Sequence, residues 1–505
     1  MSTTPAPGAA QAAPEGSLQR NSISVAGIVF LVLAAASPVI GLTGAVPVSI
    51  VIGNGVGVSL AYITIGLVLL LFAVGYVLMS RHVTDAGALY AYAAKGLGPT
   101  VGAGVAGIAV YAYTAVQIAI YGFFGAVSTA MVNPLLGIEI PWWVASLALI
   151  GLVQVFGYLH LELGAKVLGI LLVGEWGVML AMAASVAIQG GAGEGFAIGQ
   201  VFSFEALVAG APGVALMFAF ASSLGFEAAA VFGEEVKNPR RSIPRATYLS
   251  VLLIMAFFAF TTWMITVGYG ADNVVAEAGK ALESGDTASF VYALGDRYLG
   301  GWAPAMMSIF VVTSTFAAAL AFHNGIARYL FALGRGGLLP DALGRVHPKT
   351  GAPIVASVSQ TVGAAGIIAV FALVNADPIA VVFSWSGGIA VIGLLVAYLL
   401  VSLSVLAYFR RNRAADANAF NSLVAPSLSL LTMGATLWVI ILNFGTLVGG
   451  TAGLSAVLIL SVAAVFSAGF VRAKLLPARN RSLLGSGATE PGVAEPEATQ
   501  PAAWP

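Results

Sequence analysis

Two carboxyl groups interrupt long apolar runs of this sequence, and they are the residues there most able to do chemistry. Glu175 lies in the middle of the apolar residues 171–178, and Glu227 follows the apolar residues 218–226. Charged side chains inside a membrane are costly, and they commonly mark substrate or ion pathways. Because a carboxyl group in apolar surroundings can take up and release a proton, Glu175 is a candidate proton carrier.

Two other roles remain open for Glu175. It could balance the charge of a cationic substrate, or it could stay protonated and bond to a neighbouring helix. For Glu227, which directly follows a stretch that weakens a helix, we expect a structural role in bracing the chain.

The composition places these groups in a membrane protein. Of the 505 residues, 59% are apolar and 8% are charged, whereas a soluble domain carries about 25% charged residues. The absence of Cys excludes disulfides and thiolate-metal sites, and the four His residues are dispersed without ligand spacing. We therefore predict no metal site and no cofactor.

Apolar runs of roughly 20 residues are long enough to cross a bilayer, and this chain repeats them. They predict twelve transmembrane helices, near residues 24–50, 56–80, 100–131, 141–159, 163–189, 212–233, 246–269, 302–328, 353–374, 378–409, 424–447 and 451–472. Of the 21 Lys and Arg residues, all but Lys280 and Arg297 fall in the tails or in loops after even-numbered spans. By the positive-inside rule, both termini are then cytoplasmic.

The first and sixth of these spans have a middle that weakens a helix. Residues 37–44 read Ser-Pro-Val-Ile-Gly-Leu-Thr-Gly, and residues 222–225 read Ser-Ser-Leu-Gly. Pro removes a backbone donor and Gly permits an unwound backbone, and a broken span is tolerated in a membrane only where it lines a cavity or binds something. The two spans cross in opposite senses, as an inverted five-plus-five repeat requires. Each soft middle taken alone could also be a kink or a site of close helix packing.

Three cytoplasmic segments carry a family resemblance. They are residues 225–227 with 234–246, residues 327–340 with 347–353, and residues 80–90. In order and spacing they resemble the amino acid–polyamine–organocation (APC) permeases. The resemblance implies an all-α membrane protein of the LeuT-type fold, with helices 1 and 6 broken and two extra helices after the repeat. It divides the chain into a disordered tail (1–23), a transport core (24–409), helices 11 and 12 (410–473) and a second disordered tail (474–505).

In that family, backbone N–H groups of the first break hold the substrate carboxylate and backbone C=O groups of the second hold its amine. By position, the resemblance implies a substrate site at Ser37, Pro38, Val39, Ile40, Gly41, Thr43, Gly44, Phe220, Ala221, Ser222, Ser223, Gly225 and Phe226. Phe220 or Phe226 could cover the substrate, or both could be packing residues. Gln117 shares a helix face with Tyr121, and that face could meet the site or a packing partner. Many family members have Gly-Ser-Gly where this chain has Gly-Leu-Thr-Gly, so the carboxylate register stays open.

The coupling ion follows from the same alignment. In several relatives a fifth-span lysine takes the place of a sodium ion, and Glu175 falls at that position here. Residues 316–322 of the eighth span lack the hydroxyl groups that a sodium site requires, and the hydroxyls at 313–315 lie a turn away. These features favour protons or exchange over sodium, with His323 as a second candidate coupling residue.

A cytoplasmic gate is expected after the sixth span, since opposite charges are concentrated there. It consists of Glu234, Glu235, Arg240, Arg241 and Arg245. The alternative is a solvated charged loop that only obeys the positive-inside rule.

The sequence thus predicts a secondary transporter in the cytoplasmic membrane. We expect a small-molecule substrate (an amino acid or amine), a proton as coupling ion and the lipid bilayer as partners, and no nucleic acid. An enzyme is disfavoured because no Ser/His/Asp set or His/Asp cluster is apparent. A sensor or a channel-like protein on the same fold remains the alternative.

Overall fold

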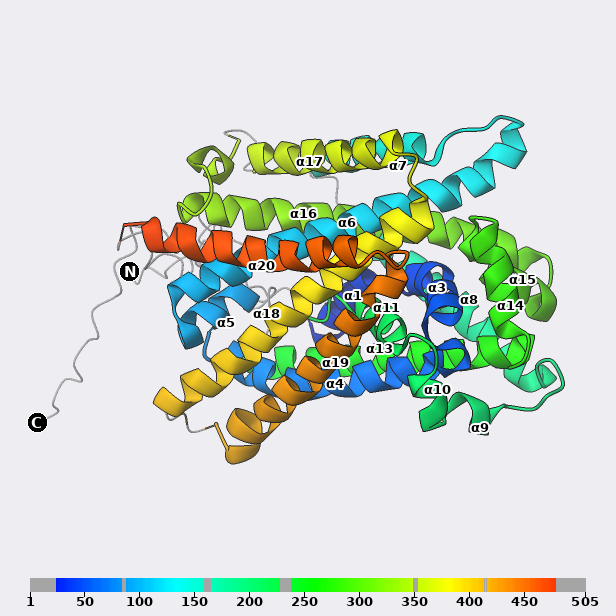
Figure 1. Cartoon of the computed structure of the whole chain (residues 1–505), viewed down its shortest axis with the longest axis horizontal. Coiled ribbons are helices and arrows are strands. Elements are labelled where there is room, and N and C mark those ends of the chain that lie inside the picture. Colours follow the sequence, from blue (N-terminus) through cyan, green and yellow to red (C-terminus); the bar gives the residue numbers. More distant parts are fainter. Residues whose placement is uncertain are drawn as a thin grey trace, which may run out of the picture.

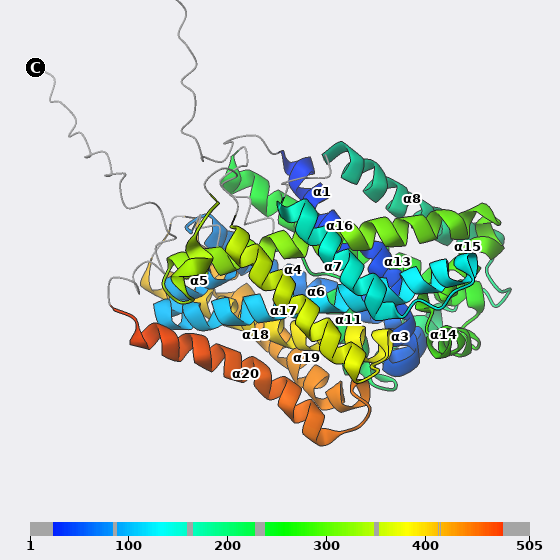
Figure 2. The same cartoon turned by 90° about the horizontal axis from the view of Figure 1, so that it is seen from above.

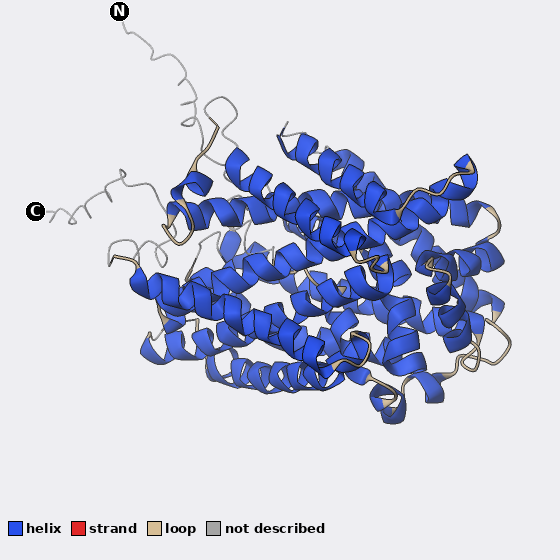
Figure 3. Cartoon of the chain, turned by 45° about the horizontal axis from the view of Figure 1, so that its top comes forward, coloured by secondary structure: helices blue, strands red, loops and turns tan. Residues whose placement is uncertain are grey.

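The computed structural model describes residues 24–83, 88–158, 165–227, 238–347, 353–412, 414 and 416–477. Every regular element in these segments is a helix (Figure 3). The expected all-α class is therefore confirmed for the described part of the chain. The two tails expected to be disordered lie outside these segments, apart from residues 474–477.

The first half of the chain forms one interrupted helical run followed by several long helices (Figure 1). The elements are α1 (Val25–Ala36), α2 (Pro38–Ile40), η1 (Gly41–Ala45), α3 (Val46–Val48), η2 (Ser49–Asn54), η3 (Gly55–Gly57), α4 (Val58–Ser80), α5 (Ala88–Leu97), α6 (Pro99–Leu136), α7 (Trp142–Tyr158), α8 (Ala165–Gln189), α9 (Ile198–Val201), α10 (Phe204–Val208) and α11 (Pro212–Ala221).

The second half begins after the described turn that follows α11. Its elements are α13 (Pro239–Tyr269), α14 (Val274–Glu283), α15 (Thr287–Leu299), α16 (Trp302–Arg335), η5 (Asp341–Gly344), α17 (Ile354–Leu373), η6 (Pro378–Phe383), α18 (Ser384–Arg411), η7 (Phe420–Val424), α19 (Ala425–Leu447) and α20 (Ala452–Leu475).

Within the described segments, nine helical runs are long and apolar enough to cross a membrane. One of them, Val25–Ser80, covers both of the first two expected spans, while Trp142–Tyr158 and Pro212–Ala221 are shorter apolar helices. A chain with so many apolar helices is a multi-pass membrane protein. The count of twelve crossings stays a prediction.

The charged segment after the sixth span differs from the expected loop. Residues 240–245 already belong to α13, which begins at Pro239. Proline at the first helical position has its φ angle fixed for a helix and needs no intrahelical acceptor. The sequence interpretation missed this helix start because it followed the apolar run alone.

Both soft segments interrupt their helices. At Ser37 the backbone is left-handed, with φ 41° and ψ 68°, and the helix restarts with Pro38. A positive φ is costly for a residue other than glycine. At the second soft segment, α11 ends at Ala221 and a non-helical turn extends to Glu227, with φ 106° at Gly225.

The interrupted elements lie inside the bundle, and long helices surround them. Helix α4 packs against α13, and α6 packs against α16, α18 and α20. Helices α7 and α17 are in contact along one side (Figure 1), and α20 forms an outer edge of the bundle (Figure 2). The long helices therefore hold the two breaks at the centre.

Candidate functional site

The two breaks contact each other through glycines. A Cβ atom on Gly41 would lie 2.5 Å from the ring of Phe258 and 3.1 Å from the Oγ of Ser222. A Cβ atom on Gly225 would lie 2.9 Å from the Cβ of Ala35. Real Cβ atoms essentially never come within 3.0 Å of another heavy atom, and 3.1 Å is already a tight contact. Glycine at each break therefore lets the chain segments come this close.

A cavity lies between the breaks. Ser37, Ile40 and Gly41 of the first break and Ala221 and Ser222 of the second line it. Its volume is about 70 Å³. Irregular backbone in a membrane protein is expected to line such a cavity, and this is the position predicted for the substrate.

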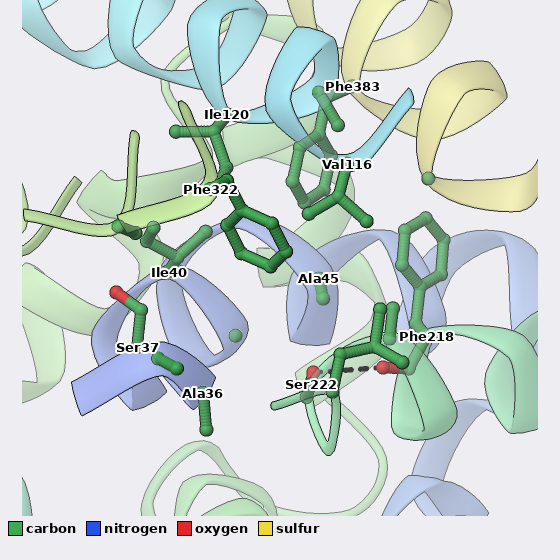
Figure 4. Close-up of a pocket in the computed structure, with 17 residues that line it drawn as sticks. Ala36, Ser37, Ile40, Ala45, Val116, Ile120, Phe218, Ser222, Phe322 and Phe383 are labelled. Carbon is green, nitrogen blue, oxygen red and sulfur yellow. Dashed lines mark hydrogen bonds between the residues drawn. The ribbon is translucent and has the colours of Figure 1, made fainter. Parts of the chain in front are cut away.

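Apolar side chains from other elements complete the wall. Val116 and Ile120 come from α6, Phe322 from α16, Phe383 from η6 and Phe218 from α11. Figure 4 shows these side chains converging on the space between the breaks. None of the described residues that line the cavity carries a charge.

The two hydroxyl groups on the wall have protein partners. The Oγ atoms of Ser37 and Ser314 are 2.7 Å apart. The Ser222 hydroxyl donates to the carbonyl of Phe218 at 2.8 Å (Figure 4). The hydroxyl oxygen of Tyr62 lies 3.0 Å from the Oγ of Ser222. The wall therefore offers few unused side-chain hydrogen-bonding groups.

Glu175 reaches the first break from α8. The backbone N–H of Val39 donates to its Oε1 at 2.9 Å, and its side chain is buried. The N–H groups in the first turn of a helix have no intrahelical acceptor, and Val39 follows the restart at Pro38. The carboxyl group of Glu175 thus acts as the acceptor that the broken helix lacks.

A hydroxyl of α16 also reaches this break, contrary to expectation. Ser314 bonds to Ser37, although the sequence interpretation placed the hydroxyls at 313–315 a turn away from the break. Helix α16 passes the first break over more than one turn, since Ala318 and Phe322 line the cavity as well. The argument against sodium from missing hydroxyls is weakened by this contact.

Glu227 is held at the second break. The N–H of Gly225 donates to its Oε2 at 3.0 Å, and the hydroxyl of Tyr113 donates to its Oε1 at 3.0 Å. The hydroxyl of Tyr76 donates to its backbone carbonyl at 2.8 Å. Its side chain is buried and does not line the cavity. These contacts stabilise the turn at the second break, as expected of a residue with a structural role.

Phe220 and Phe226, either of which could have covered the substrate, lie outside the cavity lining. Phe220 and Phe226 are fully buried and pack against Tyr398, with ring centroids 5.6 and 5.8 Å away. Phe218, two positions before the expected stretch of residues 220–226, lines the cavity and stacks on Phe383. A helical wheel of α11 could have found Phe218, because residues 218 and 222 share a face. No local signal identified Phe383.

Gln117 also lies away from the cavity lining. Its Nε2 donates to the hydroxyl of Tyr121 at 2.7 Å and to the carbonyl of Ala319 at 3.3 Å. The Nε2 of Gln360 donates to its Oε1 at 2.7 Å. Both amide atoms of Gln117 are hydrogen-bonded to neighbouring helices or to its own helix, which is the geometry of a packing residue.

The remaining expected residues of the breaks stabilise the wall. The hydroxyl of Thr43 donates to the carbonyl of Val39, and that of Ser223 donates to the carbonyl of Ala219. Pro38 is buried, and Gly44 lies against the ring of Phe123, which a Cβ atom there would meet at 2.9 Å.

The second candidate coupling residue lies outside the cavity lining. The Nε2 of His323 is 2.9 Å from the Oγ of Ser357 on α17, and the side chain is buried. Of the expected gate, Glu234 and Glu235 lie outside the described residues, while the three arginines at 240, 241 and 245 are exposed on the first turns of α13.

A family model described as amino acid permease matches residues 27–476, which is most of the chain. The chain belongs to the amino acid permease family. Membership makes this permease a membrane transporter and not an enzyme, as the APC resemblance implied.

Individual relatives of the permease differ in what their names say they carry. The low-affinity putrescine importer PlaP of Escherichia coli strain K12 is 28% identical over 401 residues, which cover 76% of this chain and 80% of that protein. The branched-chain amino acid permease BcaP of Bacillus subtilis is 30% identical over 159 residues, 32% of this chain and 30% of the relative. The methylthioribose transporter of the same organism is 27% identical over 220 residues, 43% of each chain.

Proposed function

We propose that this permease is a secondary active transporter of amino acids or related amines, working by alternating access in the cytoplasmic membrane with both termini cytoplasmic. The observation that carries the proposal is the cavity between two broken helices, with the Glu175 carboxyl group bonded to the first break. The names of the relatives include a diamine, branched-chain amino acids and a thioribose. They support a small organic substrate without selecting one.

The broken helices provide the means of binding a zwitterion. The N-terminal end of a helix segment is positive and its C-terminal end is negative. Helix α1 ends and α2 begins at the first break, and α11 ends at the second. We propose that an amino acid bound between them pairs its carboxylate with N–H groups and its amine with C=O groups. In this structure the N–H groups of Val39, Ile40 and Gly41 bond to Glu175 and to the carbonyl of Ser37, so the substrate carboxylate would replace these acceptors.

Coupling to protons, or exchange of substrates, is the mode that we propose. An ionised carboxylate accepts a stronger hydrogen bond from an N–H group than a neutral carboxyl group does. Protonation of Glu175 would therefore weaken its bond to Val39 and loosen α8 from the first break. A ligand or proton shifts a conformational equilibrium only through such a difference in interaction between the two states.

The cytoplasmic gate is a further part of the proposal. In the inward-closed state, Arg240, Arg241 and Arg245 would pair with the acidic residues at 234 and 235. The exposure of the three arginines in the structure leaves them available for such pairs. Residues 24–409 would form the transport core, and the two helices after it would support the core from outside.

The test is radiolabelled uptake by purified protein in liposomes, under imposed proton and sodium gradients. The panel contains neutral, acidic and basic amino acids and polyamines. Saturable uptake that an inward proton gradient drives, or that internal substrate stimulates, is expected. Binding without flux would instead indicate a sensor, and unsaturable flux that follows the substrate gradient would indicate a channel.

A further inference from the structure

We infer that the substrate is a neutral amino acid with a small apolar side chain, and not a diamine or a basic amino acid. This inference rests on the proposed function and narrows its substrate class. The cavity wall and the placement of the two intramembrane carboxyl groups support it.

Among the described residues, the wall has no group to balance a charge on the substrate's side chain. The described lining residues are apolar except for Ser37 and Ser222. A charge moved from water into such a wall loses its hydration and gains no partner. A diamine is charged at both ends. The backbone carbonyl groups of one break could offset the loss of hydration at one end, but the charge at the other end would have no partner.

The intramembrane carboxyl groups do not supply the missing charge. Glu175 is buried against the N–H of Val39, and Glu227 is buried against Gly225 and Tyr113. Neither carboxyl group lines the cavity. Each one is engaged by the backbone of a break, so neither is placed to balance a second charge on the substrate.

A polar substrate side chain would also be disfavoured. The Ser37 hydroxyl is paired with Ser314, and the Ser222 hydroxyl is paired with the Phe218 carbonyl and Tyr62. A substrate hydroxyl or amide facing Val116 or Ile120 would lose its hydrogen bonds to water without replacement. An aliphatic side chain loses nothing there and gains from burial.

Two residues set the size of the accepted side chain. Gly387 on α18 lines the cavity, and a Cβ atom there would meet no heavy atom within 4 Å, so it faces open space. Phe322 lines the cavity from α16, and its half-buried ring lies 6.0 Å from that of Tyr113. A larger residue at 387 should narrow the cavity without distorting the helix, and a smaller one at 322 should widen it.

The experiment is counterflow uptake in proteoliposomes loaded with unlabelled substrate, since it requires no ion coupling. The labelled substrates are alanine, valine, leucine, lysine, glutamate and putrescine. We expect uptake of one or more of the first three and none of the charged compounds. Uptake of lysine or putrescine in preference to the neutral compounds would overturn the inference while leaving the transporter proposal intact. Absence of counterflow for every compound would contradict the transporter proposal itself.

Paired variants then test the wall directly. An apolar pocket discriminates between two substrates that differ by one methylene by roughly 10–200-fold. We expect Gly387→Val to lower leucine uptake relative to alanine uptake by about that factor, and Gly387→Ala to do so more weakly. The control is Gly366→Val, at an exposed glycine of α17 with open space around it. An unchanged leucine-to-alanine ratio in both Gly387 variants would overturn the assignment of this wall.

Widening the cavity gives the opposite expectation. Phe322→Ala should raise the uptake of bulky apolar amino acids relative to alanine. Its control is Phe316→Ala, two turns earlier on α16, where the ring packs against Phe156 outside the cavity lining. A shift in Phe316→Ala equal to that in Phe322→Ala would show that the cavity wall does not select the substrate.

Discussion

The two helix breaks solve the same problem with carboxyl groups of different origin. At the second break Glu227 accepts the N–H of Gly225, two residues away in the chain. At the first break Glu175 accepts the N–H of Val39 from another helix, 136 residues away. Glu227 moves together with its own break and braces the turn, and the hydroxyls of Tyr113 and Tyr76 tie that turn to α6 and α4. A carboxyl group from α8 loses or gains its bond when α8 and the first break move apart or together.

The strongest disruption is expected at the second break. Gly225→Val places a side chain at φ 106° and against Ala35, where a Cβ atom would lie 2.9 Å from the Ala35 Cβ. Backbone strain of this kind costs of order 1–3 kcal/mol, before the steric conflict is added. Thermal unfolding in detergent should show a lower unfolding temperature and little folded protein. Gly363→Val, at an exposed glycine of α17 with open surroundings, is the control.

Removal of the local brace should have the next largest effect. Glu227→Ala leaves the Gly225 N–H and the Tyr113 hydroxyl without this acceptor. Each buried donor left unpaired costs about 1–3 kcal/mol. Glu227→Gln keeps an acceptor oxygen and should be closer to wild type in unfolding temperature, with proton-driven uptake retained. If Glu227→Gln instead abolished proton-driven uptake and kept stability, the bracing role would be wrong.

A smaller effect is expected from the hydroxyl pair at the first break. Ser314→Ala removes the hydrogen bond to Ser37 and the contact of the same hydroxyl with the Glu175 carboxyl group. Loss of a typical hydrogen bond should lower the free energy of unfolding by about 0.5–1.5 kcal/mol. Thr313→Ala is a matched control, because that hydroxyl bonds only within its own helix, to the carbonyls of Ile309 and Phe310. Equal unfolding temperatures for the two variants would show that the Ser37 contact does not stabilise the break.

The smallest effect is expected at an ion pair outside the membrane-spanning segments. Partial burial acts to raise the pKa of Asp416, but His82, the backbone and Arg81 together outweigh it, so the pKa is lowered. A lowered folded pKa gives stability that is present above the unfolded pKa and is lost as the pH falls through the folded pKa. Asp416→Asn should therefore lower the unfolding temperature at neutral pH and leave it unchanged at strongly acidic pH. The decrease should be small, because an exposed ion pair contributes little stability. It should leave the pH profile of uptake unchanged near neutrality.

The sequence was sufficient for features that depend on local chemistry. Pro38 and Gly225 marked both breaks, because a missing donor and a tolerated positive φ are properties of single residues. The intramembrane position of Glu175 could be read in the same way. The contact of Glu175 with Val39 comes from how α8 packs against the first break, which the sequence alone did not predict.

The cavity wall could not be predicted in this way. Phe322 and Phe383 reach the cavity from separate elements, and their orientation depends on how those helices cross. The contact of Ser314 with Ser37 was missed because only residues 316–322 of α16 were expected near the first break. Gln117 looked like a site residue, but it bonds to Tyr121 and Gln360 instead.

The central claim is that the remote carboxyl group couples protons while the local one braces, and one measurement tests it directly. Uptake of the transported substrate into liposomes is followed under an inward proton gradient and in counterflow, for wild type, Glu175→Gln and Glu227→Gln. The account predicts that Glu175→Gln loses accumulation against the substrate gradient and retains counterflow, while Glu227→Gln retains both. Full proton-driven accumulation by Glu175→Gln would contradict the account, and the coupling group would then be sought elsewhere, beginning with His323.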